Sequence, residues 1–306
     1  MPLALVFPGQ GSQYPGMADP WTEHQAGRAV LDRASESLER DIVELCRDEN
    51  ALSSTEIAQP AVFACDLAAA AVLEAEGVRF GAAAGHSLGE FAALVACGAL
   101  DLVPALDVVI ARGRAMQAAA DEFPGTMTAL LGPSLEEAAE ICDEARGGDV
   151  LVVANENAAK QTVLAGSIPA IERAEEAARE RGARAIRLHV AGAFHSRLMQ
   201  PAVQTIRDAL AATSFHEPKI QIAANVSGEL VGDPAALREL MAGHVVSPVR
   251  WERSVRALAE AGFDTLVEAG PGDVLSKLIR RTTPGSTVVA VGSVGAALAF
   301  AGEAPA

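Results

Sequence analysis

The feature that most restricts how this chain can fold is a serine between two glycines, placed where a short strand meets a helix. Gly85-His86-Ser87-Leu88-Gly89 matches G-x-S-x-G, after a predicted strand at 82–84 and before a predicted helix over 88–96. Small residues allow a sharp turn that leaves Ser87 at a helix N-terminus, where free N–H groups favour a developing oxyanion. The pattern alone equally fits a structural turn, but its position between strand and helix predicts a nucleophile in an α/β fold.

Strands and helices alternate in a first and a third block of the chain. The first block has a predicted strand at 3–7 and a predicted helix over 60–76, followed by the Ser87 turn. Such alternation is typical of a parallel sheet covered by helices, so the two blocks together predict one large α/β domain. The third block has predicted helices over 198–212, 235–241 and 252–261, strands at 220–225 and 265–268, a helix after Gly272, and a strand with a terminal helix within 286–302.

The middle block follows a different order, strand-helix-strand-strand-helix-strand. Ser134 and the two glutamates that follow it are typical of a helix N-terminus, and an Asn/Ala turn separates the two middle strands. This order is that of a ferredoxin-like unit. Gly- and Pro-containing hinges near 124–125 and 191–192 predict a small domain, residues 125–192, inserted into a large domain formed by residues 1–124 and 193–306.

Composition narrows the class of protein further. With 306 residues, of which 50% are hydrophobic and 21% charged, the chain can bury a large core. Its first residues run directly into a strand without the features of a signal peptide. The uncharged stretch 286–302 is short for a membrane span of roughly 20 residues. We therefore expect a cytoplasmic protein without membrane contact.

The cysteines and the net charge argue against two kinds of ligand. Four widely spaced cysteines, Cys46, Cys65, Cys97 and Cys142, form no C-x-x-C pair, so we expect no metal site and no disulfide framework. The formal charge of −16 would repel a polyphosphate backbone, so nucleic acid is not expected as a partner.

A nucleophilic serine hydroxyl needs a base, and the chain has six histidines. His195 is the best candidate because it follows a predicted strand and precedes a predicted helix. His86 adjoins Ser87 on the wrong side of the turn, and His189 lies in an alternating strand. The polar surroundings of the remaining three predict surface residues: His24, His216 and His244.

Five motifs, in this order, resemble the malonyl-CoA:acyl carrier protein transacylase family, which includes the acyltransferase domains of polyketide synthases. The resemblance covers nearly the whole chain. It implies an α/β-hydrolase-like large domain with an inserted ferredoxin-like small domain, in agreement with the pattern above. The motifs are FPGQGSQ at 7–13, GHSLGEF at 85–91, ARGRAMQ at 111–117, GAFHSRLM at 192–199 and SPVRW at 247–251.

The resemblance also implies roles at the reaction centre. Ser87 would be the nucleophile and His195 its base, with His195 oriented by the backbone carbonyl of Arg250 rather than by a carboxylate. The backbone N–H groups of Gln10 and Leu88 would form the oxyanion hole.

Four further residues resemble the family's substrate-binding positions. Arg112 would pair its planar guanidinium with the free carboxylate of a malonyl group; the alternative is a surface salt bridge on a helix. Gln59 and Asn155 would belong to the pocket. The ring of Phe194 would leave little room for an α-methyl group, which favours malonyl over methylmalonyl units.

The implied activity is transfer of a malonyl group from malonyl-CoA to the phosphopantetheine thiol of a holo acyl carrier protein. The mechanism would be ping-pong through an acyl-Ser87 intermediate, for fatty acid or polyketide biosynthesis. No cofactor is expected besides the substrates, and we expect a monomer. Because both substrates and the chain itself are acidic, a local basic patch is required. Candidates are Arg184, Arg187, Arg250, Arg253, Lys277, Arg280 and Arg281.

The sequence leaves two other functions open. A serine hydrolase would need a carboxylate between Ser87 and His195 in chain order, although no aspartate there follows an obvious strand of the main sheet. A catalytically silent carrier-protein-binding module would have no use for the serine, histidine and arginine together. The available carboxylates are Asp107, Asp121, Asp143 and Asp149.

Overall fold

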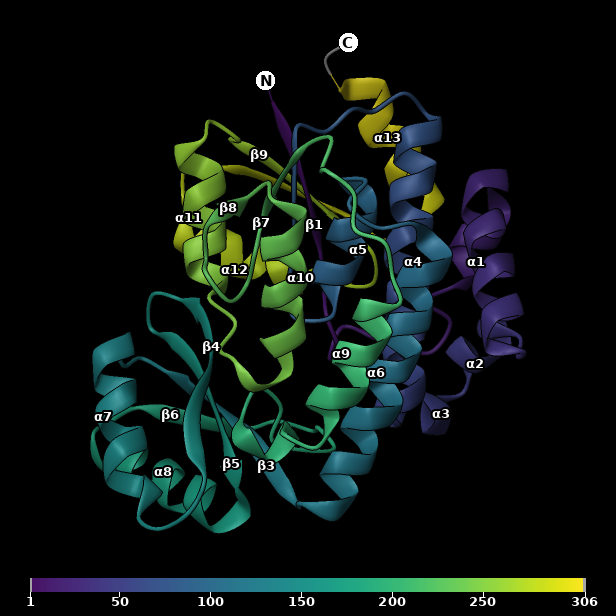
Figure 1. The fold of residues 1–306 in the computed structure, drawn as a ribbon. Coiled ribbons are helices and arrows are strands. Elements are labelled where there is room, and N and C mark those ends of the chain that lie inside the picture. Colours follow the sequence, from purple (N-terminus) through teal and green to yellow (C-terminus); the bar gives the residue numbers. More distant parts are fainter. Residues whose placement is uncertain (1, 305–306) are drawn as a thin grey trace.

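The computed structural model describes residues 2–304, which form two sheets with their helices (Figure 1). The larger sheet has six strands in the order β10-β9-β1-β2-β7-β8, all parallel except β8. The predicted parallel sheet, built from the first and third blocks of the chain, is therefore present. Its strands are β1 (Leu3–Phe7), β2 (Ala82–Gly85), β7 (Gln221–Ala223), β8 (Leu230–Val231), β9 (Thr265–Ala269) and β10 (Thr287–Val291).

The larger sheet lies in the middle of the protein because strands such as β1 are apolar on both faces. All five residues of β1 are buried, and alternate ones enter two different cores: Leu3, Leu5 and Phe7 one of them, Ala4 and Val6 the other. A strand with two apolar faces must be covered on both sides, and the intervening helices do this. One face packs against α11 (Trp251–Glu260) and α12 (Val274–Thr282), the other against α4 (Thr55–Ala75), α5 (Gly89–Ala96) and α13 (Val294–Glu303).

Helix α4 is long and apolar enough to cross a membrane by length and composition. In this protein it is a core helix, because 78% of its most apolar 18-residue window is buried. It packs against α1 (Gln25–Leu38) and α6 (Leu102–Glu122). The sequence predicted its start at Pro60, but the helix begins at Thr55 and contains the proline. The sequence predicted neither α1 nor α6, nor the three short helices that lie before α4: η1 (Asp19–Glu23), α2 (Ile42–Arg47) and α3 (Glu49–Ser53).

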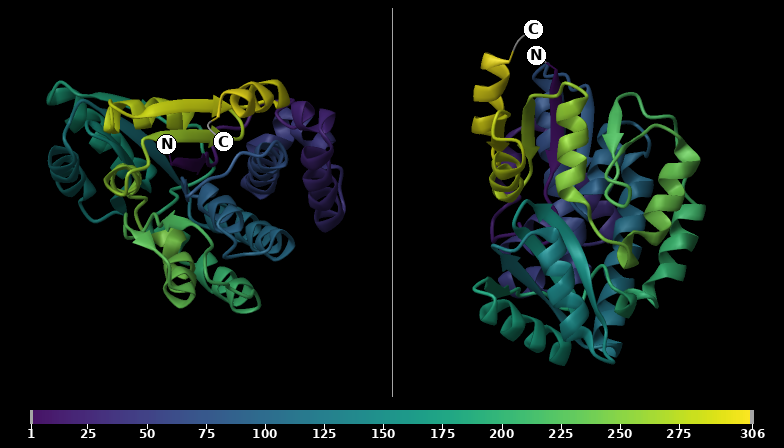
Figure 2. Two further views of the ribbon diagram at one scale, coloured as in Figure 1. Left: turned by 90° about the horizontal axis from the view of Figure 1, so that it is seen from above. Right: turned by 90° about the vertical axis from the view of Figure 1, so that its left-hand side faces the viewer.

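The second sheet has four antiparallel strands in the order β4-β5-β3-β6. Helices α7 (Leu135–Arg146) and α8 (Ile168–Glu180) cover one of its faces. Ser134 caps α7 in a capping box with Glu137, which confirms the predicted helix start. The other face turns toward the rest of the protein (Figures 1 and 2). The strands are β3 (Gly125–Leu131), β4 (Leu151–Ala158), β5 (Gln161–Ser167) and β6 (Arg184–Arg187).

The chain returns from the small sheet to the large one through helices that the sequence predicted as one. The predicted helix over 198–212 is broken at Pro201, which lacks the N–H of a helix interior. The start of β1 and the end of α13 lie at the end of the molecule opposite the four-stranded sheet (Figures 1 and 2). The remaining elements are η2 (Arg197–Met199), α9 (Ala202–Ala211), α10 (Pro234–Gly243) and η3 (His244–Val246).

Candidate active site

Ser87 lies in the turn that joins the carboxyl end of β2 to α5. Its φ of +52° is sparsely populated by residues other than glycine. The flanking glycines allow the turn because added Cβ atoms would collide with backbone. A Cβ on Gly85 would lie 1.9 Å from the backbone of Gly89, and one on Gly89 would lie 2.2 Å from the carbonyl oxygen of Phe7. The turn predicted from G-x-S-x-G is therefore a tight, strained one.

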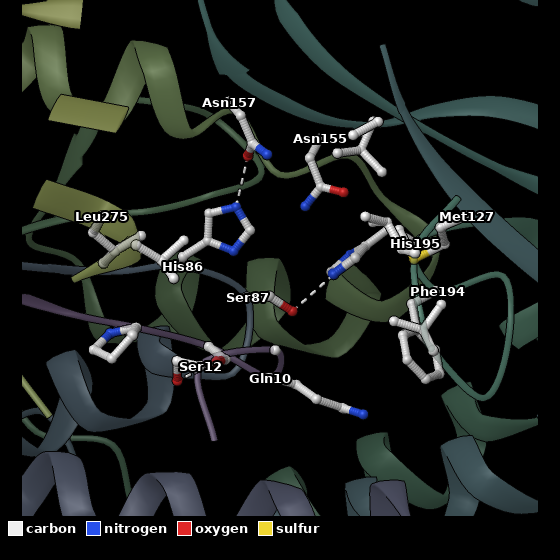
Figure 3. A pocket seen from close by; sticks show the side chains of 18 of the residues that line it. Gln10, Ser12, His86, Ser87, Met127, Asn155, Asn157, Phe194, His195 and Leu275 are labelled. Carbon is white, nitrogen blue, oxygen red and sulfur yellow. Dashed lines mark hydrogen bonds between the residues drawn. The ribbon is translucent and has the colours of Figure 1, made fainter. Parts of the chain in front are cut away.

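His195 contacts this serine directly (Figure 3). Its Nε2 lies 2.8 Å from Ser87 Oγ, and its Nδ1 lies 3.0 Å from the carbonyl oxygen of Ser247 and 3.1 Å from that of His244. Carbonyl oxygens only accept hydrogen bonds, so Nδ1 carries the proton and Nε2 presents its lone pair to the serine hydroxyl. This is the tautomer that a general base requires.

The prediction that Arg250 supplies the carbonyl that orients His195 is wrong. Arg250 is the N-cap residue of α11, and its carbonyl oxygen accepts the first helical hydrogen bond, from Ser254 N–H at 3.0 Å. The segment just before it, at η3, presents two carbonyls to the imidazole instead. His244 was also predicted on the surface, but it is completely buried, with its ring centroid 5.3 Å from that of His195.

The surroundings of His195 set its protonation state. Burial first, and the nearby Arg112 cation second, lower the pKa of His195 to about 3. An imidazole with this pKa is neutral, and able to accept a proton, at every pH well above 3.

We therefore expect the reactivity of Ser87 to be constant between about pH 5 and pH 8, because the base is neutral throughout this range. The measurement is the labelling rate of Ser87 by an uncharged serine-directed fluorophosphonate, with Ser87→Ala as the unlabelled control. A rate that fell by half near pH 6.5, the ordinary pKa of histidine, would contradict this expectation.

Arg112 projects from α6 into the same site. Its side chain is 1% exposed; Nη2 donates to Ser87 Oγ at 3.3 Å and Nη1 to Gln59 Oε1 at 2.6 Å. Burial lowers the pKa of Arg112 to about 10, so it remains a cation at neutral pH. Among residues 2–304 no carboxylate forms a salt bridge with it. The alternative of a surface salt bridge is therefore excluded, and the site holds a buried cation that lacks a bound anion.

Gln59 lies behind the cavity wall rather than in it, unlike the prediction for this residue. It is fully buried on α4, where its Oε1 accepts from Arg112 and its Nε2 lies 3.4 Å from Gln10 Oε1. Its contacts hold Arg112 and Gln10 in place.

The loop after β1 brings Gln10 beside the serine. A Cβ on Gly9 would lie 2.3 Å from the carbonyl oxygen of His86. The loop can therefore approach the backbone of His86 this closely only because position 9 is glycine. Within residues 2–304, neither the Gln10 nor the Leu88 backbone N–H donates a hydrogen bond. Two backbone donors next to Ser87 are thus free to bind a developing oxyanion.

These side chains surround a cavity of about 270 Å³ that lies between the two sheets (Figure 3). Asn155, on β4, and Phe194, next to His195, line it as predicted, and Asn155 is 5% exposed. Asn157 also lines it and lies 2.8 Å from Nε2 of His86. Much of the apolar wall comes from the small sheet and from α12, and α6 adds Met116. The residues of the small sheet and α12 are Met127, Ala129, Val163, Val274, Leu275 and Leu278.

Sequence reasoning missed several residues around the reacting pair. Asn225 contacts Ser87, His244 contacts His195, and Asn157 contacts the neighbouring His86. They come from three distant segments, and no spacing pattern marks them. Nor does the structure form the carboxylate arrangement of a serine hydrolase, since His195 Nδ1 faces two carbonyls. Asp107, Asp121 and Asp143 are exposed, and Asp149 pairs with Arg173.

Within residues 2–304, no three His, Cys, Asp or Glu side chains are grouped to hold a metal ion.

Comparison with known proteins extends this picture to the whole chain. Residues 4–296 match the acyl transferase domain family. Over 294 residues the chain is 36% identical to the malonyl CoA-acyl carrier protein transacylase of Bacillus subtilis (strain 168), covering 94% of this chain and 93% of that protein.

Solved structures agree with the sequence match. An acyl-carrier-protein S-malonyltransferase from Burkholderia pseudomallei 1710b superposes with a TM-score of 0.94 at 37% identity, covering 99% of this chain and 100% of that one. A malonyl-transacylase in complex with a type II polyketide synthase acyl-carrier protein gives a TM-score of 0.95 at 32% identity, with the same coverage. Because fold and sequence agree over almost the full length, the chain belongs to the malonyl-CoA:acyl carrier protein transacylase family and is an acyltransferase.

Proposed function

We propose that this enzyme transfers a malonyl group from malonyl-CoA to the phosphopantetheine thiol of a holo acyl carrier protein, for fatty acid or polyketide biosynthesis. The observation that carries the proposal is the buried cation of Arg112, which lies 3.3 Å from Ser87 Oγ and has no carboxylate partner. A malonyl thioester brings a free carboxylate, which matches the guanidinium in charge and shape. A hydrolase of neutral esters would have no use for this cation.

The first half of the reaction forms the acyl-enzyme. Ser87 Oγ attacks the thioester carbonyl while His195 Nε2 takes its proton, and the oxyanion is bound by the N–H groups of Gln10 and Leu88. The tetrahedral intermediate collapses, the carbon–sulfur bond breaks, and the proton on His195 goes to the departing coenzyme A thiolate. A malonyl ester of Ser87 remains, with its carboxylate on Arg112.

The second half reverses these steps with a different thiol. His195 takes the proton of the phosphopantetheine thiol, whose sulfur attacks the ester carbonyl. Collapse returns the proton to Ser87 and leaves the malonyl group on the carrier. Phe194 narrows the cavity beside the base, which supports a preference for malonyl over methylmalonyl units.

An acidic carrier needs a basic surface near the cavity, and α12 supplies one. Val274, Leu275 and Leu278 of this helix line the cavity, and Arg280 and Arg281 lie on its last turn without a carboxylate partner among residues 2–304. Four of the other candidates are paired with carboxylates: Arg187 with Glu175, Arg250 and Arg253 with Glu156, and Lys277 with Asp273.

We propose an α/β-hydrolase-like large domain, 1–124 and 193–306, on the strength of its nucleophile turn after a parallel strand. The order β4-β5-β3-β6, with both helices on one face, supports a ferredoxin-like small domain over 125–192. A cytoplasmic monomer without nucleic acid or membrane partners remains our expectation.

The test of the function is the mass of the intact protein after brief exposure to malonyl-CoA, followed by addition of a holo acyl carrier protein. We expect one malonyl adduct that is absent from Ser87→Ala and moves to the carrier. Acetyl-CoA and methylmalonyl-CoA serve as matched substrates and should give less adduct. No adduct, or one released as free malonate as fast in water as with the carrier, would favour a hydrolase.

A further inference from the structure

A buried asparagine holds the turn that carries the nucleophile. Asn225 follows β7 and is completely buried. Its side-chain Oδ1 accepts from the Ser87 N–H at 2.7 Å, and its Nδ2 donates to the carbonyl oxygen of Gly85 at 2.6 Å. A single amide group therefore satisfies backbone groups on both sides of the turn.

The turn needs such support because its backbone is strained. Ser87 keeps a φ of +52°, and a non-glycine residue stays in this region only where the surrounding structure holds it there. The two hydrogen bonds of Asn225 fix the backbone at Ser87 and so the direction of its side chain. The 2.8 Å contact from Ser87 Oγ to His195 Nε2 depends on that direction.

Asn225 is also tied to the segment that orients the base. Its backbone carbonyl accepts from Arg250 N–H at 2.9 Å, and His244 Nε2 lies 3.4 Å from its Oδ1. The carbonyl of His244 is one of the two that contact His195 Nδ1. One residue thus contacts both the turn that carries the nucleophile and the segment that holds the base.

The titratable groups that face Asn225 keep the same charge around neutral pH. Its backbone N–H donates to Glu90 Oε2 at 3.2 Å, and burial raises the pKa of Glu90 to about 8. Burial lowers the pKa of His244 well below its ordinary value. Both side chains are therefore neutral at about pH 7. Around the turn itself, burial also lowers the pKa of His86, and Arg112 stays a cation.

We propose that Asn225 is a positioning residue for acyl transfer. It holds the strained turn so that the Ser87 hydroxyl points at the lone pair of His195 Nε2. It contacts no reacting atom, since both side-chain hydrogen bonds go to backbone groups. The proposal rests on Ser87 as nucleophile, and it does not depend on which acyl group is transferred.

The test compares Asn225→Ala with Ser254→Ala, a matched control that removes a buried hydroxyl from the neighbouring segment without a contact to Ser87. Fluorophosphonate labelling gives both the number of reactive sites and the rate per site. We expect Asn225→Ala to lower the rate per site by about 10- to 100-fold. The dissociation constant for malonyl-CoA, measured in a Ser87→Ala background, should not change, and Ser254→Ala should keep the wild-type rate per site.

Asn225→Asp provides a second variant of the same shape. Its ionised carboxyl can accept from the Ser87 N–H but cannot donate to Gly85, whereas its protonated form can do both. Relative to the wild type at the same pH, its rate per site should therefore be higher at about pH 5.5 than at about pH 7. Over this range Glu90, with its pKa of about 8, stays mostly protonated, and the comparison with the wild type at each pH removes its remaining effect.

The proposal is overturned if Asn225→Ala has fewer reactive sites than the wild type but each of them reacts at the wild-type rate. That is the result a merely structural role would predict. If that variant does not fold, a wild-type rate for Asn225→Asp at both pH values overturns it. Because the label carries no malonyl group, these outcomes are separate from the failure of malonyl transfer itself.

Discussion

Replacing His195 with alanine should slow the malonylation of Ser87 by about a thousandfold, because no other group is placed to take the serine proton. Its Nε2 lies 2.8 Å from Ser87 Oγ, and the two carbonyls at Nδ1 hold the ring in the tautomer that accepts a proton. The measurement is the rate at which the malonyl adduct forms after rapid mixing with malonyl-CoA. The oxyanion donors remain in this variant, so a slow residual rate is expected rather than none.

His216→Ala is the matched control for this experiment. That histidine is exposed, its Nε2 lies 3.5 Å from Asp101, and it does not line the cavity. It should acylate like the wild type. If His195→Ala formed the adduct at the same rate as His216→Ala, the assignment of His195 as the base would have to be abandoned.

Arg112→Ala should lower kcat/KM for malonyl-CoA by about 100-fold, the loss expected when charge-assisted hydrogen bonds to a carboxylate are removed. The value for acetyl-CoA should fall much less, since an acetyl group has no carboxylate to bind. The ratio of the two values therefore shifts toward acetyl-CoA. Steady-state transfer to a holo acyl carrier protein, with each thioester in turn, measures it.

Two further variants show whether the loss of malonyl preference is specific to the guanidinium of Arg112. Arg114, also on α6, is exposed and pairs with Glu56 at 3.2 Å, so Arg114→Ala should keep the malonyl preference. Arg112→Lys retains the charge without the planar fork and should lie between the wild type and alanine. A malonyl preference that survives in Arg112→Ala would show that the carboxylate binds elsewhere.

Local signals in the sequence predicted most elements of the fold. Strand β1 was found from its apolar run, α7 from Ser134, and the nucleophile turn from its glycines. Helices η1, α2 and α3 were missed because they are short and mixed in polarity, and the longer helices α1 and α6 were missed as well. Helix α4 was predicted to begin too late because Pro60, usually a sign of a helix start, lies inside it.

The sequence by itself determined which chemical groups the site contains, because motifs and periodicity act over a few neighbouring residues. Ser87 and His195 were identified in this way, and Arg112 through the resemblance of its motif to a known family; the structure brings the three together. Which backbone carbonyls orient His195, where Gln59 lies and what supports the turn were decided only by tertiary structure. Those contacts join segments far apart in the chain, such as Asn225 and Gly85, and their partners are set by how the helices and sheets pack against one another.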